Sequence, residues 1–171
     1  LYGWRPPCTS FSRARWPPLR TTQCPWGLED LNAEQRNLID ASNTLTTFCI
    51  RVVRMCRRLG IKFALENPNS SILWCLDLSP GKEAPREYTV RVDVCQFGAP
   101  WRKAIRLLTN DARLQQVAAT CRMRDNLCCR TALSHHRLEG KSPSGRWWTA
   151  IAEPYPRKFC TSVADALSGL L

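Results

Sequence analysis

One long repeat of apolar residues between positions 32 and 59 constrains the fold more than any other feature of this sequence. Apolar side chains recur there at steps of three and four residues, at Leu38, Ala41, Leu45, Phe48, Val52, Cys56 and Leu59. This spacing predicts an α-helix with one apolar face. Asn32 with Gln35 predicts a capped start, and Gly60 predicts a left-handed end. Such a helix needs a second apolar layer against which that face can pack.

Three short runs after the helix predict β-strands that supply this layer. Residues 61–65 are mostly apolar and follow directly after Gly60, which indicates a buried parallel strand. Residues 88–95 alternate with a period of two, and residues 105–108 form a third candidate. A final helix is expected over residues 157–170. The order of these elements predicts an α/β fold.

The net charge limits the classes of partner. Lys and Arg total 25 against 14 Asp and Glu, a net charge of +11. This surplus favours a polyanion such as nucleic acid, although a solvated basic surface is the alternative. No segment has the roughly 18–20 apolar residues that span a bilayer, so no membrane partner is expected. The sequence begins at Leu1 rather than Met, which suggests a fragment of a longer protein.

The ten cysteines admit two interpretations. An even number at this density is typical of a secreted disulfide framework. The chain is long enough to bury a core without disulfides, and several cysteines fall on apolar faces, where cysteine acts as a small hydrophobe. We therefore expect reduced cysteines and an intracellular protein.

Three short motifs carry candidate chemistry. Residues 5–15 place Cys8 in a Pro-flanked loop with Arg5, Arg13 and Arg15, and nearby cations favour the nucleophilic thiolate. Residues 66–68, Glu-Asn-Pro, place a carboxyl group where an apolar strand ends, which suits an acid. Residues 96–106 contain a Gly-x-Pro turn followed by cations. Each motif alone has a simpler interpretation. The first could hold a structural cysteine, the second a glutamate of the kind common at strand ends, and the third could be any loop that faces a phosphate.

Taken in this order, the motifs resemble the DNA cytosine-5 methyltransferase family. That family has a Pro-Cys loop followed by Ser and a small residue, a strand that ends in Glu-Asn, and a Tyr/Phe-Gly-x-Pro turn with a basic run. The similar residues here are 7–8 with 11–14, then 66–67, then 97–100, and 155–159 resemble the start of the family's last helix. The resemblance implies a partial Rossmann-like methyltransferase sheet with flanking helices, incomplete at the N-terminus.

The resemblance also implies a domain organisation. Residues 1–171 would form one catalytic-half domain, with a catalytic loop at 1–27 and an α/β core at 28–110. A short recognition-like insertion would follow at 111–147, and a C-terminal helix at 148–171. DNA would be the partner, and the location would be nuclear or otherwise intracellular.

The family's mechanism assigns a role to each motif. Cys8 would attack carbon 6 of a flipped-out cytosine, and Glu66 would hydrogen-bond or protonate ring nitrogen 3. Arg102 or Arg106 would hold the carbonyl oxygen at position 2. Carbon 5 would then accept a methyl group from S-adenosylmethionine. The resemblance further implies substrate contacts from Ser12, Arg13, Arg15, Asn67 and Lys103.

The sequence departs from the family at several positions. Pro68 replaces the usual Val, Trp101 replaces the usual Gln, and the basic run is one residue longer. The Phe-x-Gly-x-Gly turn that binds the methyl donor in the family does not occur in this sequence. We therefore expect a fragment or an inactive remnant of a divergent branch. A non-catalytic, basic nucleic-acid-binding module is the alternative function.

A second candidate site lies in the predicted insertion. Cys121, Cys128, Cys129, His135 and His136 fall within sixteen residues, and such residues can bind zinc. No Cys-x-x-Cys pair is present, and adjacent cysteines point apart in most backbones. The zinc candidates are therefore Cys121, Cys128, His135 and His136, and a cysteine-rich loop without metal is the alternative.

Overall fold

The computed structural model describes residues 2–4, 6–79 and 86–169. The chain forms two compact units. Unit 1 consists of Leu1–Thr89 and Arg106–Ala112, and unit 2 consists of Val90–Ile105 and Arg113–Leu171. Arg5, expected in the Cys8 loop, lies outside the described residues.

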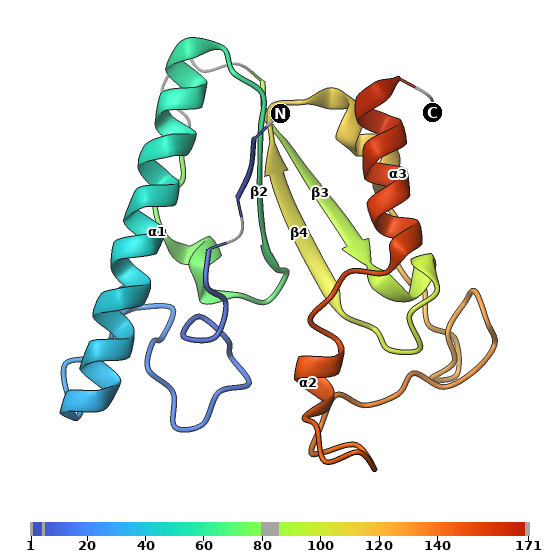
Figure 1. The fold of residues 1–171 in the computed structure, drawn as a ribbon, viewed down its shortest axis with the longest axis horizontal. Helices are drawn as coiled ribbons and strands as arrows, with labels where there is room; N and C mark the ends of the chain where they lie inside the picture. Colours follow the sequence, from blue (N-terminus) through green and yellow to red (C-terminus); the bar gives the residue numbers. More distant parts are fainter. Residues whose placement is uncertain (1, 5, 80–85, 170–171) are drawn as a thin grey trace. The chain divides into compact units, whose positions relative to one another are not determined.

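The strands form one mixed sheet (Figure 1). Its order is β1 (Tyr2–Trp4), β2 (Phe63–Pro68), β4 (Ala104–Thr109) and β3 (Tyr88–Asp93). β1 is parallel to β2, with Tyr2 opposite Phe63 and Trp4 opposite Leu65. β4 runs opposite to both of its neighbours in Figure 1. The expected α/β class is confirmed in this form, and β1 was not foreseen because residues 1–27 read as a loop.

The helix α1 (Ala33–Leu59) has the bounds that the sequence predicts. Asn32 and Gln35 form a reciprocal capping box, and Gly60 adopts a left-handed φ of 65°. The predicted buried face is wrong in part, because Leu38, Leu45, Phe48 and Leu59 are exposed. The helix instead buries Ile39, Ser42, Thr46, Cys49, Val52, Val53 and Cys56. Both sets repeat at helical spacing, and the periodicity alone cannot choose between them.

The core of unit 1 lies between α1 and β2. Cys49, Val53 and Cys56 of the helix pack with the strand residues Phe63 and Leu65 in one buried cluster. The cluster is completed by Phe11 from the N-terminal loop and by the short 3-10 helix η1 (Ile72–Cys75). The predicted strand at 61–65 therefore exists, but it begins at Phe63 and extends through Glu66, Asn67 and Pro68.

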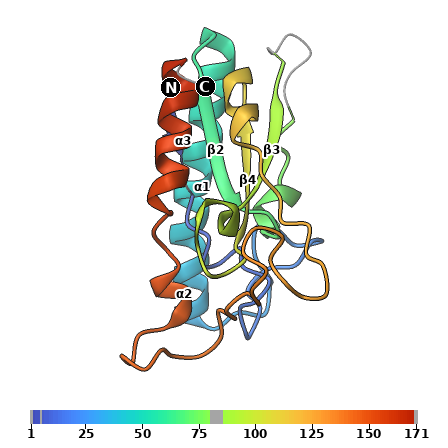
Figure 2. The same ribbon diagram turned by 90° about the vertical axis from the view of Figure 1, so that its right-hand side faces the viewer.

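Unit 2 contains few regular elements. β3 ends in the 3-10 helix η2 (Val94–Phe97), and η3 (Ala112–Val117) follows β4. The short α2 (Trp148–Ile151) precedes the last helix, α3 (Arg157–Ser168), which the sequence predicts. Phe159 of α3 packs edge-on against Phe97, with ring centroids 5.2 Å apart. Between η3 and α2 the chain runs as a long loop in both ribbon views (Figures 1 and 2).

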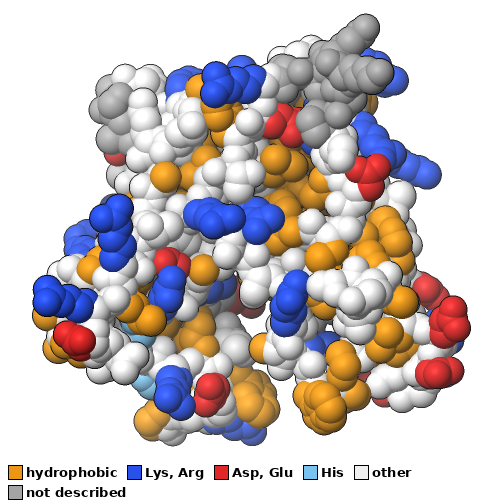
Figure 3. Space-filling view, turned by 180° about the vertical axis from the view of Figure 1, so that it is seen from behind, with side chains coloured by type: hydrophobic (Ala, Val, Ile, Leu, Met, Phe, Trp, Pro, Cys, Tyr) orange, Lys and Arg blue, Asp and Glu red, His pale blue; other side chains and the backbone are white. Residues whose placement is uncertain are grey.

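The cysteines are unpaired and the surface is rich in cations, as the composition predicts. All ten cysteines are free. Figure 3 shows Lys and Arg side chains spread over one face rather than gathered in one patch, with fewer acidic side chains among them. No helix among the described residues is both long and apolar enough to cross a membrane.

Candidate functional site

Cys8 and Glu66 both lie toward the carboxyl ends of the parallel strands β1 and β2. Cys8 follows β1 and is half-buried, and its carbonyl oxygen accepts a hydrogen bond of 3.2 Å from the Phe11 amide. Glu66 and Asn67 belong to β2 itself and are buried. In open α/β sheets this edge is where ligands bind. The structure thus places two of the three predicted motifs at the carboxyl ends of neighbouring parallel strands.

A direct hydrogen bond joins these two motifs. The side-chain amide of Asn67 donates to the carbonyl oxygen of Pro6 over 3.1 Å. Asn67 is fully buried, and its carbonyl oxygen Oδ1 has no hydrogen-bond partner among the described residues. Because an unpaired buried acceptor costs about 1–3 kcal/mol, such an atom marks a position where a ligand donor would be stabilising.

The loop that carries Cys8 is fixed by Arg20, a residue that the sequence did not single out. Arg20 is only 2% exposed, and its guanidinium lies 3.8 Å from the centroid of the Phe11 ring. It donates to Ser10 Oγ, to the Pro25 carbonyl oxygen at 2.7 Å and to Asn43 Oδ1 at 2.9 Å. Burial lowers the pKa of Arg20 to about 10. Arg20 therefore ties the loop to α1 through neutral partners.

The other loop residues have different environments. Ser12 Oγ accepts a hydrogen bond of 3.2 Å from the Ala14 amide, which makes it part of a local turn. Arg13 is exposed. Arg15 is half-buried, and its Nε is buried without a hydrogen-bond partner among the described residues. Of the predicted substrate contacts in this loop, Arg15 thus resembles Asn67 in holding an unsatisfied polar atom.

Arg106 lies beside the Glu-Asn-Pro motif. Its Nε donates to Asn69 Oδ1 over 3.2 Å, and its guanidinium lies 4.9 Å from the centroid of the Trp74 ring. The Trp74 indole in turn donates to the Pro68 carbonyl oxygen over 2.8 Å. Arg106 is part of strand β4, which confirms the third candidate strand at residues 105–108. The sequence did not single out Trp74.

Arg102 and Lys103 belong to unit 2, where both have partners. Arg102 Nε forms an ion pair of 3.2 Å with the buried carboxylate of Asp93. Lys103 Nζ donates to the Ala152 carbonyl oxygen over 2.9 Å and lies 5.8 Å from the Tyr155 ring. These contacts give both cations a role in the packing of unit 2. The structure therefore favours Arg106 over Arg102 as the arginine of the Glu66 motif.

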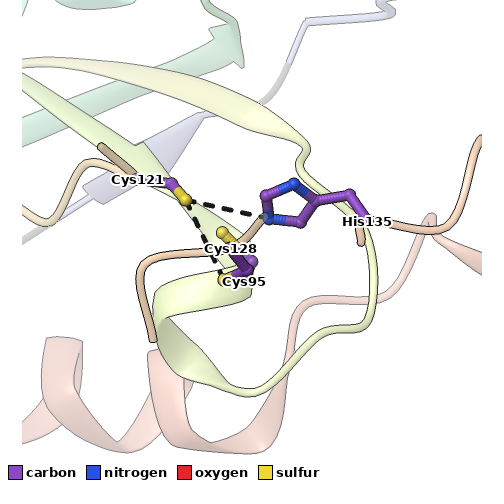
Figure 4. A group of neighbouring side chains, drawn as sticks. All are labelled: Cys95, Cys121, Cys128 and His135. Carbon is purple, nitrogen blue, oxygen red and sulfur yellow. Dashed lines mark hydrogen bonds between the residues drawn. The ribbon is translucent and has the colours of Figure 1, made fainter. Parts of the chain in front are cut away.

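A compact group of metal-binding residues forms in unit 2 (Figure 4). The sulfur atoms of Cys95, Cys121 and Cys128 and a ring nitrogen of His135 all lie within 4.8 Å of one another. Cys121 Sγ lies 3.9 Å from Cys128 Sγ and 3.8 Å from His135 Nε2. The three cysteines are buried, and the histidine is half-buried. Three of these four residues were predicted, and Cys95 was not.

Two tight turns bring the ligands of the insertion together. Asp125 and Asn126 both have positive φ, and a β-bridge joins Arg124 to Leu127 around them. This two-residue hairpin turn returns the chain from Cys121 to Cys128. A second turn follows, in which the Ala132 amide donates to the Cys128 carbonyl oxygen over 2.9 Å and the chain then reaches His135.

The thiols of this group differ in their proton affinity. Burial raises the pKa of Cys95 to about 12 and also raises that of Cys121. Burial acts on Cys128 in the same direction, but hydrogen bonds from the backbone amides of Arg130 and Thr131 outweigh it and lower the pKa of Cys128 to about 6. The Cys128 thiol therefore gives up its proton more readily than the other two thiols of the group, and the thiolate is the form that binds metals.

His136 does not belong to the group, and this part of the predicted set is wrong. Its ring packs against Trp148 with centroids 3.9 Å apart. Cys129 is exposed, and its sulfur contacts Gln96 instead. Successive residues of an extended chain point to opposite sides, so only one member of each adjacent pair can face the same centre.

A pocket of about 530 Å³ lies elsewhere in unit 2. It joins the Gly-x-Pro turn to the segment before α3, and its lining includes Trp101, Arg130, Tyr155, Arg157 and Lys158. Aromatic rings among cations are typical of surfaces that contact nucleic acid.

Comparisons with models of known families, with curated proteins and with solved structures gave no match. The fold and the two sites define a basic, mixed α/β protein.

Proposed function

We propose that the chain is the catalytic half of a divergent DNA cytosine-5 methyltransferase, with Cys8 as the nucleophile. The observation that carries this proposal is the 3.1 Å hydrogen bond from Asn67 to Pro6, which links the Cys8 loop to the Glu66 strand. The two motifs occur in the same order as in the family. This contact holds them next to each other, and a reaction that uses both motifs would require that proximity. A nuclear or other intracellular location is part of the same proposal.

The topology of unit 1 supports the proposal. β1, α1 and β2 form a parallel crossover unit, the building block of Rossmann-like sheets. Cys8 and Glu66 lie toward the carboxyl ends of its two strands, where such sheets bind ligands. A partial Rossmann-like methyltransferase sheet is therefore the fold that we propose for this unit.

Each residue has a separate chemical role in the proposed reaction. The Cys8 thiolate adds to carbon 6 of a flipped-out cytosine, and Glu66 donates a hydrogen bond or proton to nitrogen 3. The electron pair that moves to carbon 5 then takes a proton from water. Arg106 holds the oxygen at position 2. Asn67 is a positioning residue, because it sets the loop of Cys8 through Pro6.

The methyl donor does not fit the residues of this chain. A donor pocket in such sheets uses a Gly-rich turn between a strand and a helix. The connection between β1 and α1 contains one glycine, Gly27, whose added Cβ would lie 3.0 Å from the Ile39 side chain. That glycine serves the packing of α1.

A donor-free reaction tests the proposal. When the thiolate has added to carbon 6, carbon 5 takes a deuteron from heavy water. Loss of the original hydrogen from carbon 5 and of the thiolate from carbon 6 then releases cytosine with that hydrogen exchanged. We expect the protein to exchange the carbon-5 hydrogen of cytosine in DNA with deuterium from the solvent. A duplex with a pyrimidin-2-one base, which is more electrophilic at carbon 6, should form a covalent adduct visible by mass spectrometry.

Matched variants make this test specific. Cys8→Ser should abolish exchange and adduct, whereas Cys24→Ser removes an exposed cysteine from the same loop and should change neither. Asn67→Ala should slow exchange without removing the nucleophile. Wild-type protein that neither exchanges nor forms the adduct would refute the proposal, and so would an equal loss in both serine variants.

A non-catalytic nucleic-acid-binding module is the second candidate. The observation that favours it is the net charge of +11 together with the cations around the pocket at Trp101. A module of this kind binds DNA with an affinity that falls steeply with salt, because bound counterions are released. Salt-dependent binding without any exchange or adduct would select this candidate.

A further inference from the structure

We propose that Cys95, Cys121, Cys128 and His135 form a structural zinc site in unit 2. The four ligand atoms lie within 4.8 Å of one another, and three of the residues are buried. This site is separate from the cysteine and glutamate of the proposed reaction, and its existence does not depend on that reaction.

The distances fit tetrahedral coordination. With zinc–sulfur bonds of about 2.3 Å, two sulfur ligands of a tetrahedral ion lie about 3.8 Å apart. Cys121 Sγ and Cys128 Sγ are 3.9 Å apart, and Cys121 Sγ and His135 Nε2 are 3.8 Å apart. Binding therefore needs only small movements of the side chains. Three sulfurs and one imidazole nitrogen are also the ligand types that zinc prefers in structural sites.

The surroundings of the ligands resemble the outer shell of a metal site. The Gln96 side-chain amide approaches the Cys95 sulfur at 3.5 Å. The buried Asp93 carboxylate accepts the Cys121 amide at 2.7 Å. Such contacts orient metal ligands and disperse the negative charge that three thiolates bring.

The chain geometry gives the site a structural purpose. Cys95 comes from η2 directly after β3, whereas the other three ligands come from the long loop before α2. Ala132, between Cys128 and His135, is held at a φ of 56°, which a residue other than glycine rarely adopts. Zinc would fasten the loop to the end of the strand and would keep this turn closed. All four positions are filled by protein, so the ion is structural rather than catalytic.

Metal content and cobalt spectra test the site. Protein purified under reducing conditions should contain one zinc ion per chain by elemental analysis. Replacement of zinc by Co²⁺ should give the visible absorption of a tetrahedral ion and thiolate charge-transfer bands. Chelation should lower the thermal midpoint of unfolding and should increase hydrogen exchange in residues 120–137.

Sequence neighbours supply the controls. Cys95→Ser, Cys128→Ser and His135→Ala should each lose the metal. Cys129→Ser and His136→Ala should keep it, because Cys129 is exposed and the His136 ring packs against Trp148. His135→Cys should retain the metal with a changed cobalt spectrum, which separates loss of a ligand from loss of the fold. Folded, reduced wild-type protein without stoichiometric metal would overturn the proposal, as would equal loss in the neighbour variants.

Discussion

Replacement of Arg20 by Ala should destabilise unit 1 by about 3 kcal/mol. The change leaves the Pro25 carbonyl and Asn43 Oδ1 without their donor, whereas Ser10 keeps its 2.7 Å bond to Ser42. Two unsatisfied acceptors that are partly buried cost at most about 2–6 kcal/mol together. Loss of the buried methylenes and of the contact with Phe11 adds about 2–3 kcal/mol.

An opposing effect reduces this total. Burial lowers the pKa of Arg20 from 12.5 to about 10, which corresponds to about 3 kcal/mol against the charged side chain in the folded state. The variant is relieved of that penalty, so a net loss of about 3 kcal/mol remains. Arg20→Met, which keeps apolar contact with Phe11, should lose less than the alanine variant.

Urea denaturation followed by circular dichroism measures the effect. With a slope of about 2 kcal/mol per molar urea, the midpoint should fall by about 1.5 M. Arg13→Ala is the matched control, because Arg13 is exposed in the same loop, and it should change stability by less than about 0.5 kcal/mol. If Arg20→Ala is no more destabilising than this control, Arg20 does not hold the loop against α1 in the way that its hydrogen bonds suggest.

Three further substitutions test local features by the same denaturation assay. Asn32→Ala removes both bonds of the capping box and should cost about 1 kcal/mol, so an unchanged midpoint would show that the cap is not formed. Gly60→Ala should cost about 1 kcal/mol by strain, since its φ is 65° although nothing lies within 4 Å of the added carbon. Glu87→Gln should cost about 3 kcal/mol or more, because Glu87 and Arg57 pair at 2.6 Å with side chains only 7% exposed; a loss under about 1 kcal/mol would contradict that pairing.

The features that sequence predicted well are those fixed by neighbouring residues. The cap at Asn32 and the end at Gly60 depend on chemistry within a few positions. So does the period-two strand, which was predicted over residues 88–95 and is formed by Tyr88–Asp93. Hydrogen bonds of the backbone decide such features, and tertiary packing changes them little. The same reasoning found Cys121, Cys128 and His135, which lie close together in the sequence.

Features that depend on contacts between residues far apart in the sequence were not predicted. Cys95 lies 26 positions before Cys121, and no local spacing connects them. Arg20 reads as one more surface cation in a basic loop, although it is among the most buried side chains. The choice between Arg102 and Arg106 depended on which of them meets Asn69, and only the pairing of β4 with β2 decides that.

The second apolar face of α1 affects how the protein behaves in concentrated solution. Leu38, Leu45, Phe48, Met55 and Leu59 are all exposed and follow one another along the helix. At low ionic strength the charge of +11 keeps the chains apart. Added salt screens that repulsion, but it does not weaken the attraction between apolar stripes. The protein should therefore self-associate as salt rises, and a charged residue in place of Phe48 should keep it dispersed.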